Sequence, residues 1–254
     1  MLLLFLFLAC IEFVSGQDWR LGVKAGLSVP RLRASKGDGF SSGYKSLMGP
    51  QTGIVAEYRF TNLFSLQTEL NYSAQGGKKT GRQKINTAIL AGLIPPGITL
   101  PGFLYANFNS KVALNYLELP LMARFSFQTN ASSRISFYGG PYLGYLVTAT
   151  GKSEGKSKIF TDAEQTTELT LLVAGNPIAV GTQDLAMERD IIPECNRFNY
   201  GFQGGMAYTY ELNKWELFAA AGGTYGMKYL QKNSDFGRNK TGGAGVTIGA
   251  TIKL

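Results

Sequence analysis

The stretch QTGIVAEYRF-TN-LFSLQTELNYSAQ, from Gln51 to Gln75, decides the fold class. Around its centre at Thr61-Asn62, one parity of each run is apolar: Ile54, Ala56, Tyr58, Phe60, Phe64, Leu66, Leu70 and Tyr72. The other parity is mainly polar: Val55, Glu57, Arg59, Ser65, Gln67, Glu69, Asn71, Ser73 and Gln75. A period of two predicts strands with one apolar and one polar face. The short Thr-Asn connection predicts that the two strands form an antiparallel hairpin.

The rest of the chain repeats this pattern. We expect strands at 19–29, 51–60, 63–75, 112–127, 134–150, 197–210, 215–225 and 241–254. Short turns at 61–62, 128–133 and 211–214 alternate with long connections at 30–50, 76–111, 151–196 and 226–240. An even-numbered, all-β meander of this kind is typical of an eight-stranded antiparallel up-and-down transmembrane β-barrel, with long loops at one end and short turns at the other.

Three local features modify the pattern. Pro120 predicts an irregularity within the fourth strand, because proline cannot donate to the sheet. The sequence Gly139-Gly140-Pro141 predicts a bulge and leaves the faces of the fifth strand unassigned. Within the third long connection, Leu169 to Val180 reads as a small hairpin that turns at Gly175-Asn176-Pro177.

The positions of the aromatic residues favour a membrane barrel over a soluble one. Near the short-turn end, the apolar parity carries a predicted girdle of Trp19, Phe60, Phe64, Phe125, Phe127, Tyr208, Tyr210 and Trp215. Toward the other end a second belt contains Tyr72, Tyr145, Tyr200, Phe202 and Tyr225. Two such belts with aliphatic residues between them match the two interfaces of a bilayer.

On the polar parity we expect a network of lumen charges. Its members are Arg20, Lys24, Glu57, Arg59, Glu69, Glu118, Arg124 and Glu216. An eight-stranded barrel is narrow, and an unpaired charge inside it is costly. The prediction is therefore a polar, largely plugged interior in which these residues pair. The alternative is that they form the outer surface of a soluble barrel.

Composition excludes several classes of chemistry. The 254 residues include no histidine, which removes the usual serine triad and the commonest metal ligand. A general acid–base site at Glu57, Glu69 and Glu118 is less favoured than ion pairs with neighbouring basic residues. The net charge of +8 is spread along the chain, so nucleic-acid binding is not expected. We predict no enzyme activity, no catalytic residue, no cofactor and no metal.

The N-terminal segment MLLLFLFLACIEFVSG, residues 1–16, is expected to be a signal peptide. Its missing positive charge leaves a mis-called start codon or an uncleaved anchor open as alternatives. Cleavage before Gln17 leaves one barrel domain, 17–254, with Cys195 as its single cysteine. A disulfide framework within that domain is then excluded, and Cys195 is interpreted as incidental.

Four segments resemble a known family. They are GVKAGLSV, EYRFTNLFSLQTELNYSAQGGK, YLELPLMARF and YGGPYLGYLV, and the resemblance covers Leu21 to Leu254 apart from the two longest inserts. They resemble the small outer-membrane β-barrel proteins of Bacteroidota, which are labelled porin-family or PorT-like and carry an outer membrane protein β-barrel domain. The resemblance implies the Gram-negative outer membrane and carries over no catalytic residue. One departure is Leu254, where such barrels typically end in an aromatic residue.

The functional hypothesis is a surface-exposed scaffold or binding platform, as an accessory of envelope secretion or assembly. Its alternatives are a narrow channel for water or small ions and a secreted soluble barrel that binds an apolar ligand. Expected partners of the monomer are outer-membrane lipid, lipopolysaccharide phosphates at the long loops, and a protein partner there. The apolar segment from Ile89 to Phe103 is a candidate contact surface. The basic loop residues are Arg31, Arg33, Lys36, Lys78, Lys79, Arg82, Lys84, Lys152, Lys156, Lys158, Lys232, Arg238 and Lys240.

Overall fold

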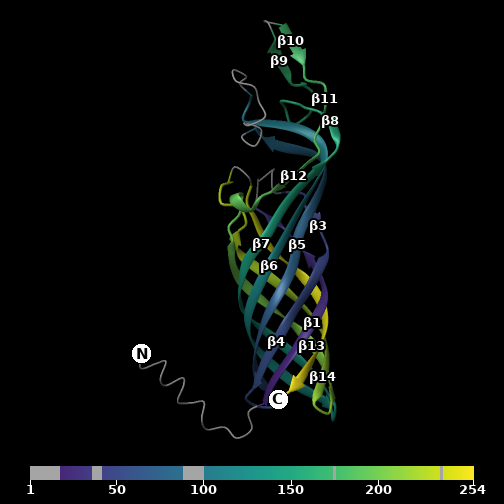
Figure 1. Cartoon of the computed structure of the whole chain (residues 1–254), viewed down its shortest axis with the longest axis vertical. Coiled ribbons are helices and arrows are strands. Elements are labelled where there is room, and N and C mark those ends of the chain that lie inside the picture. Colours follow the sequence, from purple (N-terminus) through teal and green to yellow (C-terminus); the bar gives the residue numbers. More distant parts are fainter. Residues whose placement is uncertain (1–17, 36–41, 88–99, 174–175, 235–236) are drawn as a thin grey trace, which may run out of the picture.

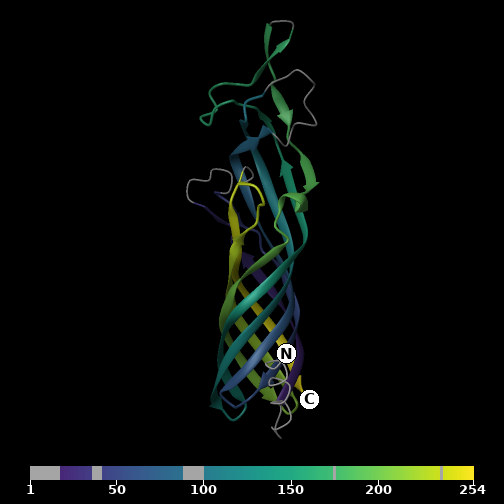
Figure 2. The ribbon, with the colours of Figure 1, turned by 90° about the vertical axis from the view of Figure 1, so that its left-hand side faces the viewer.

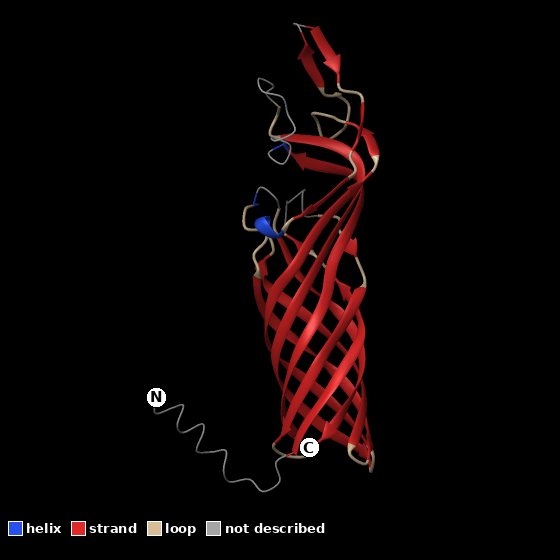
Figure 3. Ribbon diagram, viewed as in Figure 1, coloured by secondary structure: helices blue, strands red, loops and turns tan. Residues whose placement is uncertain are grey.

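A ring of long antiparallel strands encloses the interior of the molecule (Figure 1, Figure 3). The computed structural model describes residues 18–35, 42–87, 100–173, 176–234 and 237–254. Within them the ring has eight strands: β1 (Asp18–Pro30), β4 (Gly49–Arg59), β5 (Phe64–Asn86), β6 (Phe103–Asn130), β7 (Ser133–Glu154), β13 (Phe198–Leu212), β14 (Trp215–Tyr229) and β15 (Asn239–Lys253). Each pairs with the next, and β1 closes the ring by pairing with β15 from Arg20↔Lys253 to Pro30↔Gly243. The predicted antiparallel barrel is confirmed.

Shorter elements lie at the long-loop end of the barrel. They are β2 (Arg33–Ala34), β3 (Lys45–Ser46), β8 (Lys156–Lys158), β9 (Thr170–Val173), β10 (Asn176–Ala179), β11 (Thr182–Asp184), β12 (Met187–Asp190) and a 3₁₀ turn, Ile192–Glu194. Among the residues described, no helix has the length and apolar character to span a membrane. Both β1 and β15 reach the short-turn end, where the Leu254 N–H donates to the Trp19 carbonyl at 2.9 Å.

The strand faces follow the predicted parity, with the apolar side chains outward. Ile54 is 57% exposed and Leu119 is 53% exposed, whereas Glu57 is 1% exposed. The same alternation holds along β1 and β13, where large apolar residues are exposed and the polar residues between them face inward. The soluble-barrel hypothesis is wrong, because it requires the apolar parity to face inward.

The first short turn is longer than predicted. Strand β4 ends at Arg59 and β5 begins at Phe64, so the connection covers four residues, 60–63, rather than the Thr-Asn pair alone. The Thr61 hydroxyl accepts the N–H of Phe64 at 2.9 Å and that of Leu63 at 3.2 Å. These side-chain bonds let a loop of four residues turn the chain without a two-residue hairpin turn.

Three of the strands continue well beyond the barrel. The predicted insert 76–111 is wrong at both ends, since β5 runs to Asn86 and pairs with β6 from Phe103 onward. Strand β7 likewise extends to Glu154, into the predicted insert 151–196. Strands β5, β6 and β7 therefore form a wall that projects above the rim (Figure 1, Figure 2). Sequence parity missed the extension of β5, because polar residues such as Lys78, Lys79 and Arg82 occupy both of its faces beyond Gln75.

The predicted small hairpin is present as β9 and β10, with Asn176 opposite Val173. Its turn falls at residues 174–175, which lie outside the described residues, so Asn176 and Pro177 belong to the second strand rather than to the turn. The hairpin lies at the far end of the projecting wall (Figure 1).

Pro120 and the Gly139-Gly140-Pro141 segment behave differently. At Pro120 the regular pairing of β5 with β6 is interrupted between Thr68↔Leu121 and Asn71↔Glu118, as predicted for a residue without N–H. The predicted bulge at Gly139-Gly140-Pro141 is wrong, because the register shifts between β6 and β7 lie between Asn115 and Tyr116 and between Gln128 and Asn130. A Cβ at Gly140 would lie 2.0 Å from the Leu121 carbonyl oxygen, so this glycine permits close approach of two strands.

Candidate functional site

The structure places the eight predicted lumen charges inside the barrel. They project from five strands: Arg20 and Lys24 from β1, Glu57 and Arg59 from β4, Glu69 from β5, Glu118 and Arg124 from β6, and Glu216 from β14. Their side chains are at most 10% exposed where they form ion pairs, and Glu118 is 1% exposed. Seven of them take part in ion pairs and one does not.

Near the short turns, arginines and glutamates form one cluster. Glu216 accepts from Arg20 at 2.7 Å and from Arg134 at 2.5 Å, and Arg59 lies 3.6 Å away. Glu57 lies 3.6 Å from Arg124 and 3.8 Å from Arg59. We call Arg20, Glu57, Arg59, Arg124, Arg134 and Glu216 the arginine–glutamate cluster. Because its charges are desolvated, their mutual attraction is what makes their burial tolerable.

One member of this cluster was missed by sequence reasoning. Arg134, at the start of β7, donates to Glu216 and also forms an ion pair with Glu211 beside the next short turn. The available signal was parity, since Arg134, Ser136 and Tyr138 share one face of β7. Uncertainty over the glycines at 139–140 prevented that assignment.

A second ion pair lies further along the lumen. The Lys24 ammonium donates to Glu69 at 2.5 Å, and the amide groups of Gln67 and Asn71 donate to the same carboxylate at 2.6 and 2.8 Å. The carboxylate therefore has three donors. This arrangement satisfies the buried charge.

Glu118 departs from the predicted network. It accepts a hydrogen bond from the Gln75 amide at 2.7 Å, and no ion pair among the described residues includes it. Its second oxygen has no hydrogen-bond partner in the part of the chain that the structure describes. The expectation that every lumen charge pairs with an opposite charge is wrong at this position, because β1 supplies Lys24 to Glu69 instead.

Beyond Glu118 the inward side chains of β6 are apolar. Leu114, Tyr116 and Leu146 are each at most 1% exposed and pack with Leu32, Ala149, Cys195 and Leu230. Three of these partners come from outside the long strands, namely Leu32, Cys195 and Leu230. We call this group the apolar plug. The predicted interior was polar throughout; the structure has a polar half and an apolar half.

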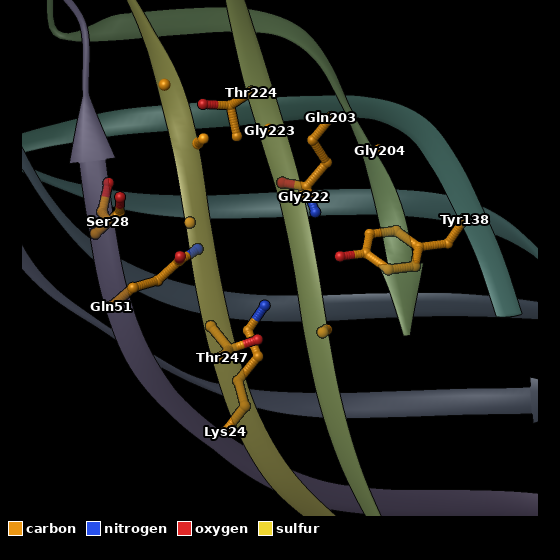
Figure 4. A pocket seen from close by; sticks show the side chains of 15 residues that line it. Lys24, Ser28, Gln51, Tyr138, Gln203, Gly204, Gly222, Gly223, Thr224 and Thr247 are labelled. Carbon is orange, nitrogen blue, oxygen red and sulfur yellow. The ribbon is translucent and has the colours of Figure 1, made fainter. Parts of the chain in front are cut away.

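Between the two halves lies a small lumen cavity of about 50 Å³ (Figure 4). Its lining includes Lys24, Gln51, Tyr138 and Gln203. Tyr138 points toward β14, where a Cβ on Gly222 would lie 2.8 Å from its hydroxyl. The cavity has room for a few water molecules, at about 10–15 Å³ each. The absence of a side chain at Gly222 therefore makes room for Tyr138 in the lumen.

A larger cavity of about 370 Å³ lies above the apolar plug, at the mouth of the barrel. Leu32, Val112, Ile191, Cys195 and Leu230 line it, together with Tyr44, Lys79 and Arg189 from its polar side. This volume is within the range of small-molecule sites, which is about 300–1,000 Å³. Arg189 is held by an ion pair with Glu194.

Cys195 lies at this cavity but is 2% exposed. Burial raises the pKa of its thiol to about 12, so the reactive thiolate is rare at neutral pH. The described residues contain no group of three or more His, Cys, Asp or Glu side chains that fits a metal ion.

The predicted girdle residues lie on the outward face near the short turns. Trp19, Phe60, Phe64, Phe125, Phe127, Tyr208, Tyr210 and Trp215 are partly exposed there. Consecutive rings touch from Trp19 through Tyr58, Phe60 and Phe64 to Phe125, with centroids 4.6–5.6 Å apart. Of the basic loop residues, Lys36 lies outside the described residues, as do residues 89–99 of the predicted contact surface.

Comparison with known protein families supports the same architecture. A family model described as "Outer membrane protein beta-barrel domain" matches residues 15–231. Ail, the attachment invasion locus protein of Yersinia pestis, is 10% identical with a TM-score of 0.37, over 93% of this chain and 99% of Ail. Neisserial surface protein A is 12% identical with a TM-score of 0.40, over 94% and 100% of the two chains. No curated protein matches the chain.

Proposed function

The chain belongs to the outer membrane protein beta-barrel domain family, and we propose that it is a non-enzymatic, surface-exposed binding platform of the outer membrane. Within that family we place it among the porin-family or PorT-like barrels of Bacteroidota. Residues 1–16 serve in this proposal as the signal peptide that exports the barrel domain, 17–254. The arrangement supports a binding role because the long connections and the wall of β5–β7 are all at one end.

One observation carries the proposal. The lumen is filled from the short-turn end by the arginine–glutamate cluster and toward the mouth by the apolar plug, while the larger cavity lies outside the plug. A barrel built in this way presents a binding site at its outer end. Its lumen offers little space for the passage of water or small ions. The observation favours the platform over the channel for water or small ions.

A conductance measurement tests the platform against the channel. The refolded full chain is inserted in planar bilayers, and its insertion is verified by heat-modifiable gel mobility. We expect no resolved conductance steps, because the Arg20–Glu216 and Lys24–Glu69 pairs and the apolar plug block the lumen. Reproducible conductance steps from the inserted protein would exclude a closed platform and support the channel.

The partners of the platform are proposed from its charge distribution. In the proposed orientation the long-loop end, with its basic residues, lies on the outer surface of the cell, where the phosphates of lipopolysaccharide are. The mouth cavity and the projecting wall offer surface for a protein partner of envelope secretion or assembly. Surface crosslinking in intact cells tests the protein contact, since a platform without partner proteins would yield the barrel alone.

A further inference from the structure

Four lysines lie side by side across the short strand β3 and the wall that β5, β6 and β7 form above the barrel. Lys45 is opposite Lys78, Lys78 is opposite Lys111, and Lys111 is opposite Lys152. Directly opposite residues of antiparallel strands point to the same face, with Cβ atoms about 5 Å apart. All four side chains are exposed. We call these residues the lysine row.

The row points to the same side as the apolar outer face of the barrel. Tyr72, Leu117 and Tyr145 form an exposed outward rung, and two further rungs separate it from the lysines: Ala74, Asn115 and Thr148, then Gly76, Ala113 and Thr150. Lys78 lies six positions after Tyr72 along β5. With about 3.3 Å per residue and a tilt of about 40°, the row lies roughly 15 Å beyond the aromatic rung along the barrel axis.

Charge compensation is concentrated at one end of the row, where Glu154 also interacts electrostatically with Lys111. Lys152 lies 2.8 Å from Glu154 and is opposite Glu188 of β12. Lys45, Lys78 and Lys111 take part in no ion pair among the described residues. Like charges directly opposite each other destabilise a sheet, and Glu154 and Glu188 at one end do not balance four lysines, so the row favours an anion from outside the chain.

The surroundings of the row suit a sugar-bearing anion. Below it, Gly76, Ala113 and Thr150 have small side chains that leave the lysines accessible from the membrane side. Above it the next outward rung is Thr80, Asn109 and Glu154, which offers hydrogen-bonding groups. A phosphorylated saccharide finds both charge and hydrogen-bond partners at this position.

We propose that the lysine row binds the phosphate and carboxylate groups of lipopolysaccharide sugars in the outer leaflet. Phospholipid phosphates fit less well, because a headgroup layer extends only about 5–8 Å beyond the hydrocarbon core. The row stands higher than that and meets the sugar layer. This inference rests on the proposed surface orientation. It assigns to the wall the role of fixing how deeply the protein sits in the outer membrane.

The test is a binding titration of the refolded full chain in detergent micelles, with fluorescent lipopolysaccharide that carries a phosphorylated core. We expect Lys78→Gln with Lys111→Gln to weaken binding about 25-fold at low salt, at roughly fivefold per lysine. The matched control is Lys214→Gln with Lys253→Gln, which removes the same charge at the short-turn end and is expected to leave the Kd unchanged. Lys45→Gln with Lys111→Gln tests the same row if the first variant does not fold.

Two results would overturn the assignment. One is wild-type affinity in both lysine-row variants, with heat-modifiable mobility showing that they are folded. The other is equal competition by phosphatidylglycerol, which would indicate general attraction to anionic lipid. Failure of the wild-type chain to enter the outer-membrane fraction would instead contradict the platform itself, so the two proposals fail in distinguishable ways.

Discussion

The two halves of the barrel interior are filled by side chains of opposite chemistry. Next to the short turns, Glu57, Glu216 and four arginines fill the lumen, whereas Leu114, Tyr116 and Leu146 fill it toward the mouth. The change occurs within β6 between Glu118 and Tyr116, which are consecutive inward residues. The polar half depends on specific partners, while the apolar half depends on volume and on loop residues that complete it.

This difference has a functional consequence. A charged cluster holds its strands in one arrangement, because moving any member leaves the buried charge of another without its partner. An apolar plug tolerates rearrangement of similar volume and forms a dry floor for the cavity above it. The rigid half therefore anchors the barrel, and the adaptable half lies where a ligand or partner would dock.

The largest expected effect comes from breaking the polar half. Glu216→Gln leaves Arg20, Arg59 and Arg134 without their shared carboxylate, and we expect a loss of about 3–5 kcal/mol in the free energy of unfolding. Urea titration of the barrel refolded in lipid vesicles measures it. The matched change in the apolar half, Leu146→Met, conserves volume and is expected to cost less than about 1.5 kcal/mol. Equal losses in the two variants would remove the distinction between the halves.

A second, smaller effect compares two outward positions of β6. Leu119→Arg places a charge on the apolar band and is expected to cost about 2–4 kcal/mol in vesicles. Asn109→Arg makes a cationic side chain on the same strand in the projecting wall and is expected to change stability by at most about 0.5 kcal/mol. The same urea titration measures both. A small effect at Leu119 would contradict its assignment to the lipid-facing band.

Parity along single strands predicted the barrel and the inward side of most of its residues. Alternation survives in β4, β6 and β13 because each strand has one face against lumen side chains and one face outside. It failed where this contrast is absent, as in the wall beyond Gln75, and where the glycines of β7 obscured the side of Arg134.

Contacts between strands lay beyond what one sequence can predict. The partner of Glu69 is Lys24, and that of Glu216 includes Arg134, because the register across the ring sets which inward charges meet. The lysine row has the same origin: Lys45, Lys78, Lys111 and Lys152 are far apart in the chain and become neighbours only through pairing register. The apolar plug was missed since loop residues such as Leu32 and Leu230 complete it.

The smallest expected effect is confined to the projecting region and leaves the barrel unchanged. At the loop after β8, the Asp162 carboxylate accepts the Thr166 N–H at 3.0 Å and the Thr167 N–H at 2.6 Å. The backbone hydrogen bond from Thr166 is the main reason that the pKa of Asp162 falls from 3.8 to about 2. The loop therefore gains stability from this group above pH 3.8 and loses it as the pH falls through about 2.

Two measurements check this local switch. The carboxyl ¹³C shift of Asp162 is expected to titrate near pH 2, while the heat-modifiable mobility of the barrel stays unchanged at neutral pH in Asp162→Asn. That variant turns an acceptor oxygen into an N–H donor facing the backbone N–H groups, so chymotrypsin is expected to cleave faster at Phe160 beside the loop. Unchanged cleavage would mean that β-bridges of Phe160 to Tyr105 and Glu168 hold the loop without Asp162. Loss of the heat-modifiable gel mobility of the barrel would show instead that the projecting region and the barrel unfold together.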